Sequence, residues 1–461
     1  EEAAAAAAEE ACRRQAGAEH SLLQRTPQLL LQQAAEACEA QRQWLGAAGR
    51  QGQGAGAWPP LKDWPANCAS AKKVCFSQDE LVAVGQDGEA GSYWRAPDVA
   101  PLRWFGEQRV VFNMPGYFDG LEGVQSTVFP LQVRPVARRM ETARLSEAPL
   151  LNITPIIVFP TYPFNFGDTM GPNFMHSWVQ WTAAHPEVLK MPLAVALPHK
   201  LMLPPFWRLV EDLDQQVETF SQLSLPCASG PVCFEEVIGC SGFGGKPWYS
   251  YVDTDGGRAW EAFRSKVVSK RCPQGAGADA DGALVVAFAQ RGRNRLLRNL
   301  ENLTAACRAA GRLAGRPLRC EEVKFKDVRK DICRLQRADV LVGIHGAQLA
   351  NALFMRPGAS LLEVRPHDWW DAGPDGRLLD PDAWPNVLAQ KVWLTNRTRY
   401  WFYGALANES FPDRRSSVPG RDSDVQVSWP LLKCMLERIA TSSGHDGLSL
   451  KVNAGCSRAH A

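Results

Sequence analysis

Between residues 283 and 364, short apolar runs alternate with helix-prone segments, and this order constrains the fold more than any other feature of the chain. Strands alternating with helices form mainly parallel sheets, because a crossover helix returns the chain to the same end of the sheet. The segment therefore predicts an α/β, doubly wound unit, which binds ligands beyond the carboxyl ends of its strands. The predicted strands are 283–289, 322–325, 339–344 and 360–364, and the predicted helices are 299–312, 331–338 and 347–354.

A less regular alternating unit precedes it. The apolar runs 109–112 and 156–159 predict strands, and residues 192–203 predict a strand followed by a turn. We expect a loop and then a helix in 165–184, one amphipathic helix over 206–220, a cysteine- and glycine-rich loop over 226–245, and a helix around Trp260.

The chain has 461 residues, which is too long for one ordinary core and suits two domains. Residues 1–56 are rich in Ala, Glu and Gln and predict a helix-prone stem or linker. We predict a first domain over 57–271 and a second over 272–461, joined by the Gly- and Ala-rich linker 272–281.

Charge and cysteine content narrow the class of protein. The net charge is +2, which gives no basic excess to hold a polyanion, so we expect no nucleic-acid partner. Of the 13 cysteines, Cys68, Cys75, Cys227, Cys233 and Cys240 lie in Pro-, Gly- and Ser-rich segments that are typical of loops, and this favours disulfides in an oxidising compartment. Unpaired cysteines remain the alternative. Asn-x-Ser/Thr sequons at Asn152, Asn302, Asn396 and Asn408 also favour the secretory pathway.

The strongest local signal is the turn Gly343-Ile344-His345-Gly346-Ala347, which follows a buried strand and starts a helix. Small residues allow a ligand to approach the backbone, and a helix start with free N–H groups suits a diphosphate. His345 would add a hydrogen bond or a positive charge, and Glu363, at the end of the next strand, would grip ribose hydroxyls. A tight structural turn with a core histidine remains the alternative.

An arginine-rich turn, residues 290–298, follows the first strand of the same unit. Arginines at the carboxyl end of a strand clamp phosphate pairs well, because the guanidinium group donates two parallel hydrogen bonds. A solvated basic turn is the alternative.

In this order and separation, the two segments resemble glycosyltransferase family 61. The family pattern is an Arg-rich turn, an Asn at a helix start, and then G-x-HGA-x-L-x-N-x-x-F-x-x-PG-x-x-x-x-E. This sequence matches it with Arg291, Arg295, Asn299, Gly343, His345, Gly346, Ala347, Leu349, Asn351, Phe354, Pro357, Gly358 and Glu363. The match covers about 283–366, with weaker similarity in 421–436 and in the segment CFEEVIGC.

The resemblance implies a GT-B fold, with two Rossmann-like domains facing a cleft, and inverting transfer from a UDP-sugar to a hydroxyl. It implies that Arg291, Arg295 and the His345 turn hold the diphosphate. The sequence departs from the family in the first domain, where N-x-x-H-x-x-x-D is usual. Here Asp168 stands in place of the His, and Pro172 or Asn173 falls where the acid is expected.

Inverting transfer needs a base for the acceptor's proton. Asp168 is the first candidate and His176 the second, and a capping or surface role is the alternative for each. The sequence Asp253-Thr254-Asp255-Gly256-Gly257 contains the DxD pair that holds a metal in other transferases, but its glycines predict a turn. The arginines would neutralise the leaving group without a metal, so we expect no metal site and no cofactor.

The sequence thus predicts a transferase that moves xylose, GlcNAc or a related sugar to a protein-linked glycan or polysaccharide. A non-catalytic pseudo-transferase and a nucleotide-cofactor oxidoreductase remain as alternatives, although no strand is followed by GxGxxG with an acidic residue downstream. We expect the lumen of the Golgi or endoplasmic reticulum. Because the chain begins at Glu1, any signal or membrane anchor would lie upstream, as in a type II membrane protein.

Overall fold

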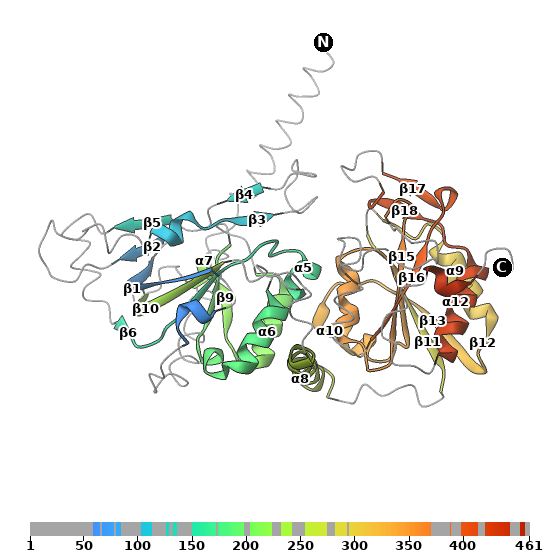
Figure 1. Cartoon of the computed structure of the whole chain (residues 1–461), viewed down its shortest axis with the longest axis horizontal. Helices are drawn as coiled ribbons and strands as arrows, with labels where there is room; N and C mark the ends of the chain where they lie inside the picture. The colour runs from blue at the N-terminus through green and yellow to red at the C-terminus, as the bar shows by residue number, and fades with distance from the viewer. Residues whose placement is uncertain are drawn as a thin grey trace, which may run out of the picture.

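The computed structural model describes residues 59–64, 67–77, 80–83, 103–112, 126–128, 132–135, 150–171, 174–197, 203–223, 232–241, 254–273, 282–292, 295–369, 388, 398–413, 420–442 and 452–456. The predicted stem and Asp253 lie outside them. The described residues form two large β-sheets with helices between and around them (Figure 1). The α/β class is confirmed, and the two sheets are consistent with two Rossmann-like domains.

The first sheet is mixed, with the strand order β5-β2-β1-β10-β7-β8-β9, and β6 also pairs with β10. The four strands β10, β7, β8 and β9 run parallel, whereas β1 runs antiparallel to both β2 and β10. The bounds are β1 Asn67–Ser77, β2 Glu80–Ala83, β5 Gln132–Pro135, β6 Leu150–Leu151, β7 Ile156–Phe159, β8 Leu193–Val195, β9 Val217–Thr219 and β10 Val232–Ser241. A separate antiparallel pair consists of β3 Val110–Phe112 and β4 Ser126–Val128.

Two disulfides cross between neighbouring strands of this sheet. Cys68 pairs with Cys240 and Cys75 with Cys233, each joining residues that face one another in the β1–β10 register. The prediction that these cysteines lie in loops is wrong, because Cys68 and Cys75 lie in the long strand β1 and Cys233 and Cys240 in the long strand β10. Three of the four are fully buried, and Cys68 is partly buried. The prediction of disulfides is confirmed, since three more join Cys272–Cys333, Cys307–Cys320 and Cys434–Cys456.

The helices of the first half include η1 Leu61–Asp63, α5 Phe166–Met170, α6 Met175–Ala184, η2 Pro186–Lys190, η3 Pro205–Leu213, α7 Phe220–Leu223 and α8 Thr254–Arg271, and residues 103–107 are also helical. The predicted helix 206–220 is wrong beyond Leu213. Asp214 adopts a left-handed conformation (φ 67°) that ends η3, and the β-branched Val217 and Thr219 then enter the buried strand β9. The turn predicted at Asp253–Gly257 is also wrong for Thr254–Gly257, which form the start of α8.

The second sheet has the order β12-β13-β11-β14-β15-β16, and all pairs except β12–β13 are parallel. Its strands are β11 Leu284–Ala289, β12 Arg312–Leu313, β13 Arg316–Val323, β14 Val340–Ile344, β15 Ser360–Arg365 and β16 Arg399–Gly404. The predicted parallel unit is confirmed. One strand is shifted, because Ala314 and Gly315 (φ 47° and 80°) make a hairpin that starts β13 earlier than the predicted 322–325.

Helices cover both faces of this sheet (Figure 1). Helices α9 Leu300–Ala310 and α12 Trp429–Thr441 lie on the face away from the first half of the chain, and α10 Val328–Leu335 and η5 Ala347–Phe354 lie on the face toward it. The remaining elements are η7 Ala407–Glu409, β17 Ser410–Pro412, β18 Ser423–Val425 and η8 Val452–Gly455.

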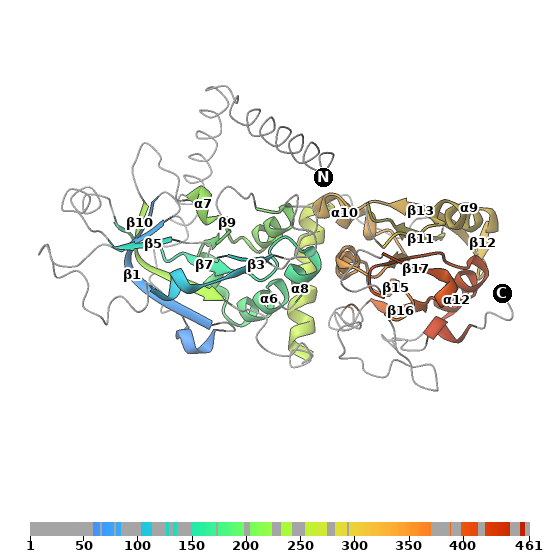
Figure 2. The ribbon, with the colours of Figure 1, turned by 90° about the horizontal axis from the view of Figure 1, so that it is seen from above.

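The two halves share one hydrophobic core where α8 and α10 meet (Figure 2). Trp178 of α6 and Trp260 of α8 belong to the same buried cluster as Ile332 of α10 and Phe354 of η5. The disulfide Cys272–Cys333 closes the seam just after α8. Among the helices that the structure describes, none combines the length and the apolar character of a bilayer-crossing segment.

Candidate functional site

The predicted site lies where the direction of chain winding reverses in the second sheet. From β11 the chain crosses by α9 to β13 on one side, and then returns by α10 to β14 on the other side of β11. Open α/β sheets bind ligands at such a reversal, outside the carboxyl ends of the strands on either side of it. Arg291 follows β11, and His345 follows β14.

Arg291 and Arg295 lie directly on the His345–Gly346 backbone. A Cβ placed on Gly346 would come within 1.9 Å of Arg291 Nη1, and Gly346 has φ 155° and ψ 169°, a conformation that is nearly confined to glycine. Arg295 Nη1 donates a hydrogen bond of 3.2 Å to the His345 carbonyl oxygen. Gly346 is thus required by its conformation and by the guanidinium group that packs against it.

Arg291, Arg295 and Arg421 form an arginine cluster, which carries more positive charge than the neighbouring Asp422 neutralises. Burial first, and then repulsion from Arg291, lower the pKa of Arg295 to about 9, although Asp422 opposes them. Burial also lowers the pKa of Arg291. Asp422 is 3.4 Å from Arg295 Nε and also forms two short hydrogen bonds with Arg421. Because clustering guanidinium groups is costly without an anion, the arrangement suits a phosphate-bearing ligand.

His345 belongs to a second, buried network around Glu363, which is fully buried. Glu363 Oε1 contacts His345 Nδ1, and Oε2 accepts from the Tyr400 hydroxyl and from Arg365 Nε at 3.1 Å. Arg365 Nη2 donates to the Tyr400 hydroxyl at 2.7 Å. Glu363 and Arg365 both come from β15, and Tyr400 comes from the neighbouring β16.

The network fixes the charges of its members. Burial would raise the pKa of Glu363, but Arg365, His345 and Tyr400 outweigh it and lower that pKa to about 2. Burial lowers the pKa of His345, and Arg295 and Arg365 add to this effect against the attraction of Glu363. Glu363 is therefore ionised at neutral pH, and the imidazole of His345 is neutral.

Comparison with known proteins bears on this part of the chain. Residues 202–362 match the family model described as Glycosyltransferase 61. The resemblance to glycosyltransferase family 61 is confirmed. Both arginines and the His345 turn lie inside the matched range, and Glu363 follows its last residue.

Two relatives carry the same printed name, Protein O-linked-mannose beta-1,4-N-acetylglucosaminyltransferase 2. The proteins of Canis lupus familiaris and Bos taurus are each 29% identical to the chain, over 145 and 130 residues. The alignments cover 29% and 26% of the chain, and 24% and 21% of the relatives. The match to each relative therefore spans less than a quarter of that protein's length.

Three other residues of the family 61 pattern have structural contacts. Both polar atoms of the Asn299 side chain bond to the Val427 backbone, at 2.8 and 3.0 Å. A Cβ on Gly343 would meet the Leu349 side chain at 2.7 Å, so that glycine permits close packing inside the core. Ala347 starts η5 and contacts Gly167 of α5. Their predicted role in ligand binding stays a prediction.

The two candidate bases lie in different settings. Asp168 is half-buried in α5. Burial, and then the negative charge of Asp168, raise the pKa of Tyr162. The preceding residue, Gly167, packs against Ala347 at the start of η5, so α5 places Asp168 close to the second half of the chain. His176 is buried between α6 and α8, with its ring 5.8 Å from that of Trp260. Asp168 therefore remains the better placed candidate.

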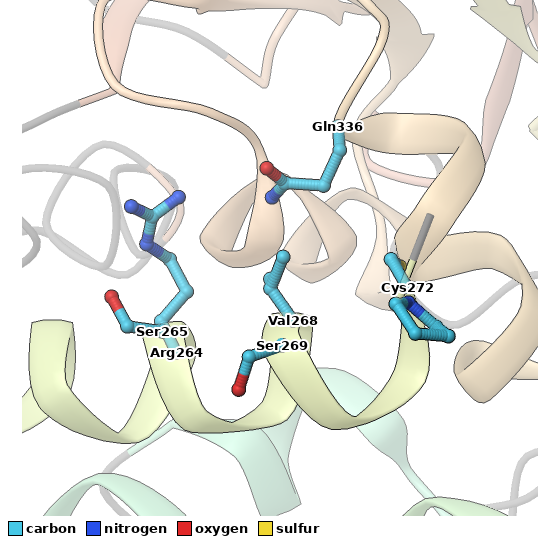
Figure 3. A pocket seen from close by; sticks show the side chains of 7 residues that line it. Arg264, Ser265, Val268, Ser269, Cys272 and Gln336 are labelled. Atoms are coloured by element: carbon cyan, nitrogen blue, oxygen red, sulfur yellow. The ribbon is translucent and has the colours of Figure 1, made fainter. Parts of the chain in front are cut away.

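The far end of η5 is held by residues around a pocket of about 390 Å³ at the seam between the halves (Figure 3). Arg264 of α8 donates to the Met355 carbonyl, and Gln336 donates to the Phe354 carbonyl. None of the predicted site residues lines this pocket; its lining is Arg264, Ser265, Val268, Ser269, Cys272, Pro273 and Gln336. The pocket therefore lies among residues that hold the C-terminal end of η5, and it is separate from the predicted site.

Sequence reasoning missed Arg421, Asp422, Arg365 and Tyr400. Arg365 lies two residues after Glu363 on the same strand, so period-two alternation could have placed both on one face. Tyr400 and the Arg421–Asp422 pair are far away in sequence and carried no signal of this kind. Among the described residues, His, Cys, Asp and Glu side chains form no group of three that could hold a metal ion.

Proposed function

We propose that this chain is an inverting glycosyltransferase of the GT-B type. It moves xylose, GlcNAc or a related sugar from a UDP-sugar to a hydroxyl of a protein-linked glycan or polysaccharide. One observation carries the proposal: Arg291 and Arg295 pack on the Gly346 backbone at the winding reversal, within the range that matches family 61. The relatives' printed name supports a sugar donor and a glycan acceptor.

The arginine cluster supplies the chemistry of the leaving group. As the glycosidic bond to UDP breaks, negative charge grows on the diphosphate, and fixed guanidinium groups in a poorly hydrated site stabilise that charge. Asp168 would take the proton of the attacking acceptor hydroxyl from the first half of the chain. The charge of the leaving group needs no divalent cation in this arrangement, so transfer proceeds without metal.

The five disulfides among the described residues support a lumenal protein of the Golgi or endoplasmic reticulum, and so do the exposed sequon residues Asn152, Asn302 and Asn408. A membrane anchor upstream of Glu1 would complete the proposed type II arrangement. The acceptor would then be a glycan or glycoprotein in the same compartment.

A nucleotide and sugar screen tests the function. UDP should raise the melting temperature of the chain, whereas NAD and NADP should leave it unchanged. Among UDP-xylose, UDP-GlcNAc and related donors, one should be hydrolysed slowly in the absence of acceptor. Protection by NAD would favour the oxidoreductase alternative. UDP binding without hydrolysis or transfer would favour the pseudo-transferase.

A further inference from the structure

The hydrogen bonds around Glu363 determine which nitrogen of His345 carries the proton. Oε2 of Glu363 receives two donors, Arg365 Nε and the Tyr400 hydroxyl, and both favour the ionised carboxylate. An ionised carboxylate can only accept hydrogen bonds. The proton between Oε1 and Nδ1 therefore belongs to Nδ1 of His345.

A neutral imidazole with its proton on Nδ1 has a lone pair on Nε2. Arg295 and Arg365 add positive charge near the ring, which disfavours a second proton, and Trp369 packs at a ring distance of 5.4 Å. Nε2 makes no hydrogen bond to any residue in the described part of the chain, and the side chain keeps 7% of its surface exposed. Nε2 is thus available as an acceptor beside the arginine cluster.

We propose that His345 binds a hydroxyl group of the sugar nucleotide through Nε2, as a hydrogen-bond acceptor, and does not donate to the diphosphate. This inference rests on the proposed function and refines the role of one residue in it. The guanidinium groups of Arg291 and Arg295 hold the phosphates, and the imidazole one residue before Gly346 selects a hydroxyl. Glu363, Arg365 and Tyr400 are positioning residues that set the tautomer.

The substitution His345→Asn separates the two roles. The Asn amide nitrogen takes the place of Nδ1 and still donates to Glu363, so the buried network stays paired, while the acceptor at Nε2 is lost. Affinities of wild type and variant are compared by calorimetry for UDP, 2′,3′-dideoxy-UDP and UDP-GlcNAc. His367→Asn is the matched control, because His367 has a side chain that is 41% exposed and pairs with Asp368.

The expected result is a loss of about fivefold in affinity, typical of one neutral hydrogen bond, confined to the ligands that carry the hydroxyl. A loss for UDP but not for dideoxy-UDP identifies a ribose hydroxyl. A loss for UDP-GlcNAc alone identifies the transferred sugar. An equal loss for all three ligands would mean that His345 contacts the diphosphate, and no loss for any of them would mean no contact; either result overturns the inference.

An independent measurement uses the wild-type chain. The ¹⁵N NMR shifts of the imidazole, assigned with the His345→Asn variant, distinguish a protonated nitrogen from one with a lone pair. We expect a protonated Nδ1 and an unprotonated Nε2 at neutral pH, and a protonated Nε2 would overturn the inference. If wild type binds no UDP at all, the proposed function fails separately, whatever the tautomer.

Discussion

The two sheets are stabilised in different ways at their most buried points. In the first sheet, the fully buried disulfide Cys75–Cys233 crosses between β1 and β10, whose neighbouring side chains are buried and apolar. In the second sheet, fully buried positions carry charged side chains: Glu363 and Arg365 are both fully buried and form an ion pair with each other. Buried charge is costly unless it is fully paired, so the second sheet carries polar groups that a purely structural core would not need.

This difference indicates where the chemistry lies. The first sheet is a covalently reinforced scaffold that supplies α5 and α8, which hold the two ends of η5. The second sheet holds a charged network directly behind the His345–Gly346 turn, which we propose contacts the ligand. Changes in the first sheet should therefore affect stability, and changes in the second should affect stability and binding together.

The largest effect is expected for Glu363→Ala, because it leaves the Arg365 guanidinium buried without its carboxylate. We expect a loss of about 3–5 kcal/mol in the free energy of unfolding, measured in urea. Glu437→Ala, at an exposed position, is the control and should change little. The double variant Glu363→Ala, Arg365→Met should recover part of the loss. A single variant as stable as wild type would mean that the charged network is not what stabilises the second sheet.

The buried Glu363 carboxylate also predicts that the free energy of unfolding decreases at low pH. The pKa of Glu363 falls from 4.5 to about 2 on folding, so its contribution is complete above the unfolded value and is lost as the pH falls toward 2. Wild type should therefore lose more stability than Glu363→Ala between these pH values.

The next effect belongs to the first sheet. Replacing Cys75 and Cys233 together by Ser should lower the free energy of unfolding by about 2–4 kcal/mol, because the unfolded chain gains freedom. UDP affinity of the folded variant should stay unchanged. The matched control replaces Cys434 and Cys456, which close a shorter loop in the second half, separated by 22 residues rather than 158. Weakened UDP binding in the Cys75 and Cys233 variant would show that the scaffold also shapes the donor site.

Arg295→Ala tests binding in the second half. Losing a charge-assisted hydrogen bond costs about 1.5–3 kcal/mol, so UDP affinity should fall roughly tenfold or more in calorimetry. Arg298→Ala is the control from the same turn, since Arg298 is half exposed and pairs with Asp424. Equal UDP affinity in wild type and a folded Arg295→Ala would mean that this arginine supports the His345–Gly346 turn without binding the diphosphate.

Gly167→Ala tests the contact between the halves. A Cβ there would lie 2.9 Å from Ala347 Cα, so α5 and η5 must separate, at a cost of about 1–3 kcal/mol. Turnover should fall more than UDP affinity, because Asp168 moves relative to the His345–Gly346 turn. Gly292→Ala, which has nothing within 4 Å, should behave like wild type. Normal turnover in a folded Gly167→Ala would remove Asp168 from the list of bases.

The smallest expected effect is that of a chelator, which should leave transfer unchanged. A cation among the buried arginines would meet like charges, and these guanidinium groups already neutralise the leaving diphosphate. Activity is measured with and without excess EDTA. If EDTA abolishes transfer, Mn²⁺ restores it and Asp253→Asn prevents the rescue, the DxD holds a metal and the charge argument is wrong.

Local pattern was sufficient for β11, β14 and β15 of the second sheet, because each of them is a fully buried run. It misplaced β13, in which polar and apolar residues are mixed, and it did not predict β16. It was insufficient for β1 and β10, whose pairing joins residues 67–77 with 232–241. It also failed at Asp214, where a left-handed residue divides one apparent helix into a helix and a strand. In both places contacts distant in sequence override the local preference.

The sequence by itself determined the α/β class, the parallel order of the second unit, and the placing of Arg291, Arg295 and His345 after its strands. Apolar periodicity and the carboxyl-end rule suffice for these, since both are local properties. Only the tertiary structure decided that Glu363 is buried and paired with Arg365 and Tyr400, and that α5 and α8 hold η5 from the other half. Burial and charge pairing depend on which strands become neighbours, and that information is not local to any segment of the chain.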